Sequence, residues 1–286
     1  LFQNFGSDGS KLDDFMARYS INPDDPEDPR LWNEWKGVLT GNDEGVQSFV
    51  LNAITALKAL SNHKIAKLTS KSDFSLEQMR DEKIIIYFIT PPQHAEYYSF
   101  LTSIFFRSVF NSCMRKMPTR TTLPVYVLYD EFGHSTIPNF VSTANTIRGY
   151  NVSISIILQS IAQLNARYGR DYADSIKGGF NSYLSYAGSD PETASFFERI
   201  IGKQRITQLP NDIQHFTEHY REQNLLNANE VRTMDTNQVL IVTSNRNPVL
   251  IRSYPFFELR KFKRMTARGV HKVSSTVIDH IKYIKL

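Results

Sequence analysis

The chain has 286 residues, of which 41% are hydrophobic and 22% charged, a composition typical of globular proteins with one large or two small domains. Its net charge is +4, and its single cysteine, Cys113, excludes a disulfide framework and a cysteine-based metal site. A lone thiol also favours a reducing, cytoplasmic setting.

No apolar run approaches the roughly 18 residues that a membrane span needs, and no signal peptide is visible. Because the chain starts at Leu1 rather than at a methionine, we expect a fragment whose membrane anchor, if it has one, lies upstream.

The first part of the chain, residues 1–42, is polar and is expected to be irregular. The acidic run from Asn22 to Pro29 contains three prolines, which exclude a long helix or a strand there. Helical spacing of apolar residues begins at Glu44 and continues to Leu60, and a helix cap is predicted at Ser75.

Between about Lys83 and Lys203, strands and helices alternate, and this alternation predicts an α/β fold with a parallel sheet. Strands are expected at residues 83–90, 124–129, 152–158 and 182–186, and helices near residues 94–117, 138–149, 161–168 and 172–177. The first of these strands is apolar throughout, which indicates burial on both faces.

The pattern becomes less regular after Lys203. Residues 225–232 are expected to form a short capped helix, and the β-rich runs 238–243 and 248–253 are expected to form a hairpin at the sheet edge. Eight Lys and Arg against only Glu258 and Asp279 lie between Pro255 and Leu286. Such a basic tail attracts phosphates or lipid headgroups, or it is simply a solvated helix and linker.

The most informative segment is Pro124–Gly133, an apolar strand that ends in two adjacent carboxylates, Asp130 and Glu131. Ligands of open α/β sheets bind beyond the carboxyl ends of the strands. There, Asp130 could hold Mg²⁺ through its water shell, and Glu131 could orient or deprotonate an attacking water. This is the pattern of a Walker B element, although a strand ending in two solvated acids remains the alternative.

Two further side chains fit the same chemistry. Gln159 follows the next strand, where it could hydrogen-bond a γ-phosphate or the lytic water, or be an exposed residue of a β-to-α turn. Arg148 ends the helix before that strand, and it could cap the carbonyls of its own helix or reach the nucleotide of a neighbouring subunit as an arginine finger.

The chain resembles the type IV coupling proteins of conjugation and type IV secretion in three segments that follow in this order: Val127–Gly133, Ile147–Tyr150 and Ile157–Leu164. Further similar segments are 74–80, 83–87, 188–194, 201–203 and 225–232. The similarity extends over roughly residues 44–257 and is most specific between Asp130 and Gln163.

The resemblance implies a RecA-like P-loop NTPase core with a mainly parallel sheet, and ATP and Mg²⁺ as cofactors. Residues 1–42 would be the end of an all-helical insertion or a polar linker, residues 43–257 the Walker B side of the core, and residues 258–286 the basic tail. Asp130 would be the Mg²⁺ residue, Glu131 and Gln159 would act on the water and the γ-phosphate, and Arg148 would be a finger candidate.

The family resemblance also implies partners and a place in the cell. It predicts a hexamer at the cytoplasmic face of a bacterial inner membrane, handing DNA with its relaxase, or protein effectors, to components of a type IV secretion channel. Two alternatives remain open: another hexameric DNA-pumping or secretion ATPase, and a non-catalytic docking module of the same fold.

One motif of the family is missing. A phosphate-binding loop of the form Gly-x₄-Gly-Lys-Ser/Thr does not occur, and the nearest run, Gly6–Leu12, has the wrong spacing and follows no strand. We therefore expect this chain alone to hydrolyse little or no ATP.

Overall fold

The computed structural model describes residues 9–20, 28–39, 43–208 and 219–267. The chain divides into two compact units, one within residues 1–75 and the other within residues 76–274. The domain boundaries expected after residues 42 and 257 stay predictions.

The first unit is helical in its described residues. It contains α2 (Gly9–Tyr19), α3 (Arg30–Leu39), α4 (Asp43–Leu57), the 3-10 turn η1 (Lys58–Ser61) and α5 (His63–Thr69). The expectation of an irregular segment was therefore wrong for α2 and α3, because apolar residues lie at helical spacing there. Trp35 is buried against Phe15, Met16 and Trp32. Most of the predicted turn-rich segment 22–29 lies outside the described residues.

A pair of parallel strands forms the centre of the second unit. β1 (Val125–Tyr129) pairs in parallel with β2 (Val152–Ile156), from Val125 opposite Val152 to Tyr129 opposite Ile156. The crossover between them consists of η4 (Phe132–His134), α7 (Phe140–Thr146) and η5 (Ile147–Tyr150). The predicted parallel strands are thus confirmed for this pair.

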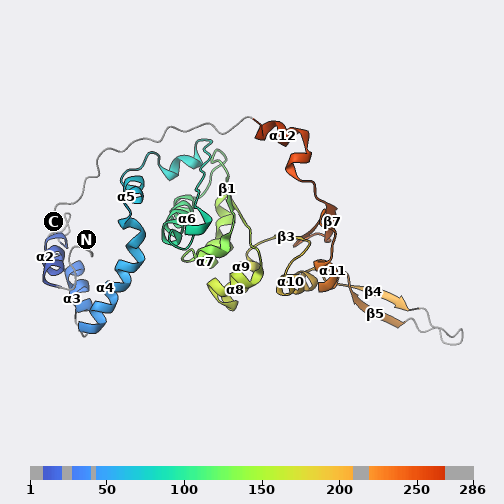
Figure 1. The fold of residues 1–286 in the computed structure, drawn as a ribbon, viewed down its shortest axis with the longest axis horizontal. Helices are drawn as coiled ribbons and strands as arrows, with labels where there is room; N and C mark the ends of the chain where they lie inside the picture. The colour runs from blue at the N-terminus through green and yellow to red at the C-terminus, as the bar shows by residue number, and fades with distance from the viewer. Residues whose placement is uncertain (1–8, 21–27, 40–42, 209–218, 268–286) are drawn as a thin grey trace. The chain divides into compact units, whose positions relative to one another are not determined.

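One face of this pair is covered by helices. α6 (Ser99–Met114), α7, α8 (Ile161–Tyr168) and α9 (Arg170–Gly178) surround a core in which Val127 and Tyr129 of β1 are buried (Figure 1). The other buried members of the core are Val109, Phe110, Cys113, Phe132, Ile137, Phe140, Ala144, Ile147, Val152, Leu164, Ala173 and Ile176. This core fixes the crossover and the loops beyond the strands.

The remaining described strands are antiparallel. β3 (Ser182–Tyr186) pairs with β6 (Gln238–Thr243), which pairs with β7 (Val249–Arg252), so the predicted 238–253 hairpin is confirmed. α10 (Pro191–Ile201) and α11 (Ala228–Arg232) pack beside this sheet through Phe197, Val231 and Leu240. β4 (Lys203–Gln208) and β5 (His219–Asn224) form a separate two-stranded ladder, which the sequence analysis did not predict.

The strand expected at residues 83–90 pairs with none of the described strands. The segment runs between η2 (Leu76–Arg80) and η3 (Pro92–His94), with Ile85 78% and Ile89 85% exposed. The outward side chains of β1, Tyr126 and Leu128, are also 73% and 77% exposed. The expected burial of residues 83–90 on both faces was therefore wrong, because within the described residues no second layer covers these side chains.

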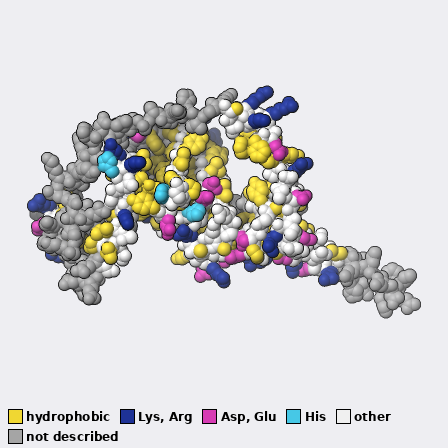
Figure 2. Space-filling model, in the orientation of Figure 1, with side chains coloured by type: hydrophobic (Ala, Val, Ile, Leu, Met, Phe, Trp, Pro, Cys, Tyr) yellow, Lys and Arg dark blue, Asp and Glu magenta, His cyan; other side chains and the backbone are white. Residues whose placement is uncertain are grey.

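The described C-terminal end consists of η6 (Phe256–Glu258) and the basic helix α12 (Arg260–Thr266). Lys and Arg side chains gather around α12 together with hydrophobic ones (Figure 2), and Phe256, Phe257 and Phe262 are exposed there. In the part of the chain that the structure describes, no helix has the length and apolar character needed to cross a bilayer.

Replacing Phe110 by alanine is expected to destabilise the second unit by about 3–5 kcal/mol, because Phe110 is only 2% exposed and contacts Phe106 and Phe140. The free energy of unfolding of the full-length protein would be measured in denaturant. Phe257→Ala, at a site 59% exposed, is the matched control and should cost less than about 0.5 kcal/mol. Equal losses for the two variants would contradict the assigned core.

Candidate functional site

The acid pair lies where β1 ends. Asp130 and Glu131 are exposed, and the backbone N–H of Glu131 donates to Oδ1 of Asp130 over 3.0 Å. Both residues line a cavity of about 380 Å³, together with residues of the 88–95 segment, α6, Tyr129, His134 and Ser135. Asp130 and Glu131 therefore border a space large enough for a small ligand.

Glu131 has a strained backbone. Its φ of 52° and ψ of 43° place it in the left-handed region, which costs a non-glycine residue of order 1–3 kcal/mol. Such conformations persist where the surroundings fix them, and they cluster at functional sites. This left-handed conformation turns the chain after Asp130, and Phe132 of η4 is bonded to Ile157, the residue that follows β2.

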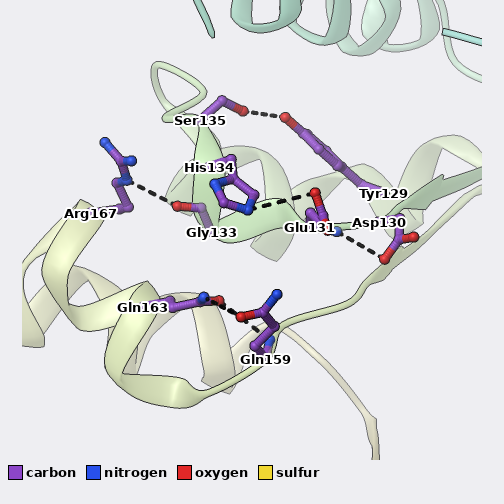
Figure 3. A network of polar contacts seen from close by, with 9 residues as sticks. All are labelled: Tyr129, Asp130, Glu131, Gly133, His134, Ser135, Gln159, Gln163 and Arg167. Atoms are coloured by element: carbon purple, nitrogen blue, oxygen red, sulfur yellow. Dashed lines mark hydrogen bonds and ion pairs between the residues drawn. The ribbon is translucent and has the colours of Figure 1, made fainter. Parts of the chain in front are cut away.

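The parallel ladder continues beyond the assigned strands and brings Gln159 beside the acids. The N–H of Ile157 donates to the carbonyl of Tyr129 over 2.9 Å, and the N–H of Phe132 donates to the carbonyl of Ile157 over 3.0 Å. The turn with Glu131 is thereby bonded to the segment that leads to Gln159, and Figure 3 shows the side chains of Glu131 and Gln159 in one view. Gln159 is not among the residues that line the cavity.

The geometry adds His134 to the acid pair. His134 Nε2 lies 3.6 Å from Glu131 Oε2, and the two form an ion pair whenever the imidazole is protonated. Both side chains are about half exposed. His134 is therefore placed to restrict the rotamers of Glu131.

Two tyrosine hydroxyl groups form hydrogen bonds with the loop that follows the acid pair. Tyr129 shares a hydrogen bond with Ser135, and burial raises the pKa of Tyr129. The hydroxyl of Tyr168 accepts the N–H of Ile137 over 2.9 Å, and burial raises the pKa of Tyr168 to about 12. Both phenols are therefore neutral at ordinary pH and act as fixed hydrogen-bonding supports rather than as acids.

Helix α8 also holds this turn. Arg167 Nε donates to the carbonyl of Gly133 over 2.9 Å, and the side chain of Gln163 packs against the same glycine. Sequence reasoning assigned no role to Gln163, Arg167 or Gly133. The signal that could have found Gln163 is its place three residues after the N-cap Ser160, from which a side chain can reach back to the residues before the helix.

Arg148 is not part of this assembly. It lies in η5, directly before β2, whereas Asp130, Glu131 and Gln159 follow the strands. Since β1 and β2 are parallel, Arg148 is at the opposite end of the sheet. It is exposed, and within the described ranges its guanidinium has no hydrogen bond or ion pair, so its own helix is not capped by it.

The side chains beyond the end of β1 provide part of what a magnesium–nucleotide site needs. No group of three or more His, Cys, Asp or Glu in the described part of the chain could hold a metal by protein ligands alone. One exposed carboxylate, Asp130, suits Mg²⁺, which keeps most of its waters and is shared with phosphates. No phosphate-binding loop lies in the described residues, and the run 6–12 lies partly outside them, its remainder falling in α2.

Comparisons with known proteins identify the family to which the chain is similar. A sequence model of the type IV secretory system conjugative DNA transfer family matches residues 12–279. The VirD4 protein of Rhizobium radiobacter is 24% identical over 282 residues, which is 94% of this chain and 40% of VirD4. VirD4 of Agrobacterium fabrum is 23% identical over 239 residues, 79% of this chain and 36% of that protein. The chain thus spans well under half the length of these relatives.

Solved structures show a similar fold. The bacterial conjugative coupling protein TrwB, unbound, superposes with a TM-score of 0.64 at 14% identity, over 75% of this chain and 50% of TrwB. TrwB in complex with ADP and Mg²⁺ gives a TM-score of 0.62 at 14% identity with the same coverage. The predicted RecA-like α/β fold is therefore confirmed.

Replacing Gly133 by alanine is expected to lower the thermal midpoint of the full-length protein by several degrees. A Cβ there would lie 2.7 Å from Gln163 Oε1 and 3.0 Å from its Cβ, and such overpacking costs typically about 1–3 kcal/mol. Gly178→Ala is the control, because a Cβ on Gly178 meets nothing within 4 Å in helix α9. Adding Gln163→Ala to Gly133→Ala should restore part of the midpoint, and no recovery would contradict this contact.

Proposed function

The chain belongs to the family of type IV secretory system conjugative DNA transfer proteins, and from this premise we propose that it is the Walker B side of an ATP-driven coupling motor. The motor hands DNA, protein or both to a type IV secretion or conjugation channel. As this chain covers 40% of VirD4, the activity, substrates and partners of the whole protein are part of the proposal.

One observation carries the proposal. The register of β1 and β2, extended by the bonds of Ile157, places Asp130, Glu131 and Gln159 together at the carboxyl ends of two parallel strands. Open α/β sheets bind nucleotides at this edge. The site has the hard oxygens for Mg²⁺ and an amide for a phosphate or a water.

The roles follow from chemistry and position. Asp130 would hold Mg²⁺ through water, Glu131 would orient and deprotonate the attacking water, and Gln159 would hydrogen-bond that water or the γ-phosphate. Bound Mg²⁺ would supply charge neutralisation between the phosphates. TrwB, described in complex with ADP and Mg²⁺, supports these cofactors for the family.

The exposed face of β1, with Tyr126 and Leu128, is evidence that a second half of the site lies elsewhere in the protein. The apolar side chains of Ile85, Ile89, Tyr126 and Leu128 are mostly exposed, and burying such side chains contributes about 1.5–3 kcal/mol each. We propose that the part of the protein that carries the phosphate loop covers this face. This chain alone should therefore bind and hydrolyse ATP poorly.

The proposal extends to assembly. Arg148 is too far along the sheet to reach the acids of its own chain, because it precedes β2 and they follow β1. An arginine finger role would thus require a neighbouring subunit, which suits a ring-shaped homo-hexamer. We further propose that the motor works at the cytoplasmic face of a bacterial inner membrane with channel components, and with DNA and its relaxase or protein effectors.

Glu131→Gln in the full-length protein is expected to reduce ATP turnover at least about 100-fold while nucleotide affinity stays within a few-fold, since the amide keeps the shape but cannot take a proton. Steady-state hydrolysis and binding of a fluorescent ATP analogue would be measured. Glu82→Gln, at an exposed carboxylate outside the cavity lining, is the matched control.

Normal turnover of the Glu131→Gln protein would reject the motor assignment. A wild-type full-length protein that neither binds nor hydrolyses ATP would instead favour a non-catalytic docking module. DNA-stimulated turnover without any transfer in a conjugation assay would favour another hexameric DNA pump.

A further inference from the structure

The side chain of Gln163 makes two hydrogen bonds to one residue. Its Oε1 accepts the backbone N–H of Gln159 over 3.3 Å, and its Nε2 donates to Oε1 of Gln159 over 3.2 Å. Gln163 is half-buried on the first turn of α8, and Gln159 is exposed. The contact therefore connects the helix to the residue that faces the acid pair (Figure 3).

These two bonds decide which end of the Gln159 amide is presented to the site. A backbone N–H can only donate, so the atom of Gln163 that it meets must be the oxygen. The other end of the Gln163 amide is then the NH₂ group, and the atom of Gln159 that it meets must be an acceptor. The NH₂ group of Gln159 is thus turned away from Gln163, and Figure 3 shows it on the side of Asp130 and Glu131.

Gln163 is itself held in place from three sides. Its backbone N–H donates to the N-cap Ser160 Oγ over 3.4 Å, and the N–H of Ile161, two residues earlier in α8, donates to Thr193 Oγ1 over 3.0 Å. On the other side its amide packs on Gly133, where even a methyl group would overlap with Oε1. The position of the Gln163 amide is therefore fixed by the packing of the turn after the acids.

We propose that Gln163 is a positioning residue that orients the Gln159 carboxamide with its donor end toward the acid pair, and that Gly133 is required for this contact. The role in turnover rests on the proposed function of the site. A donor facing Glu131 suits a phosphate oxygen or the oxygen of the attacking water, both of which accept hydrogen bonds. An inverted amide would present an oxygen to the phosphate oxygen and repel it, and toward the water it could only accept a hydrogen bond.

Gln163→Glu tests the orientation with almost no change in shape. A carboxylate at this position still accepts the N–H of Gln159, but it cannot donate to Oε1 of Gln159. The Gln159 amide should then rotate to give its NH₂ group to the carboxylate. Gln163→Leu removes both bonds without adding a charge, so Gln159 should become free to adopt both orientations.

The first measurement needs no nucleotide. Hydrogen exchange of peptides spanning residues 157–164 would be followed in the full-length protein. Gln163→Leu should speed exchange of the Gln159 amide about 10-fold or more, whereas Gln163→Glu should leave it near the wild-type rate. Equal exchange in wild-type and Gln163→Leu proteins would overturn the proposal, whatever the activity of the protein.

The second measurement is ATP turnover in the same proteins. Gln163→Glu should lower kcat roughly 10-fold to 100-fold with KM for ATP within about 3-fold, and Gln163→Leu should fall between it and the wild type. In a Gln159→Ala background, adding Gln163→Glu should change kcat by less than about 2-fold, because both changes act through one side chain. Gln204→Glu on β4 is the control for the added charge and should leave kcat unchanged.

Additive losses in the double variant, or a wild-type kcat in Gln163→Glu, would overturn the proposal. The outcome is separable from that of the proposed function. If Glu131→Gln retains full turnover but Gln163→Leu still speeds exchange at Gln159, the motor assignment fails and the orienting contact stands. If Glu131→Gln loses turnover and Gln163→Glu does not, only the positioning role fails.

Discussion

The parallel pairing of β1 with β2 is the constraint on which the rest of the site depends. Each strand is only five residues long, but two further backbone hydrogen bonds through Ile157 continue the ladder past Tyr129. Those bonds lock the left-handed turn at Glu131 against the segment leading to Gln159. Without them, the strain at Glu131 could be released, and the acids and the amide would no longer share a fixed geometry.

Helix α8 is the second element that holds the site in place. Its N-terminal turn fixes the Gln159 amide, and one turn later Arg167 and Tyr168 bind the backbone of the 133–137 loop. The same helix thus contacts the segments that follow both strands. Local mutations on α8 should therefore act on the acids and on the glutamine together, although none of its residues is an acid or a base of the proposed reaction.

The sequence predicted those elements whose side-chain pattern is strong by itself. The apolar runs of β1 and β2 and the two carboxylates after Tyr129 were recognisable without coordinates, as was the hairpin at residues 238–253. β4 was missed because Lys203, Gln204 and Arg205 show no apolar alternation. The arrangement around Gly133 could not be foreseen, since it depends on how closely a helix side chain approaches a turn. Pairing of residues 83–90 was predicted from apolarity alone, which does not identify a partner strand.

The uncovered side of β1 has a practical meaning for handling this polypeptide. Tyr126, Leu128, Ile85 and Ile89 present apolar side chains to water beside backbone groups that have no ladder partner among the described strands. Surfaces of this kind are adhesive, because a second molecule can both bury the side chains and complete the hydrogen bonding. When produced alone, the polypeptide should be colloidally unstable, forming concentration-dependent aggregates that a mild detergent disperses.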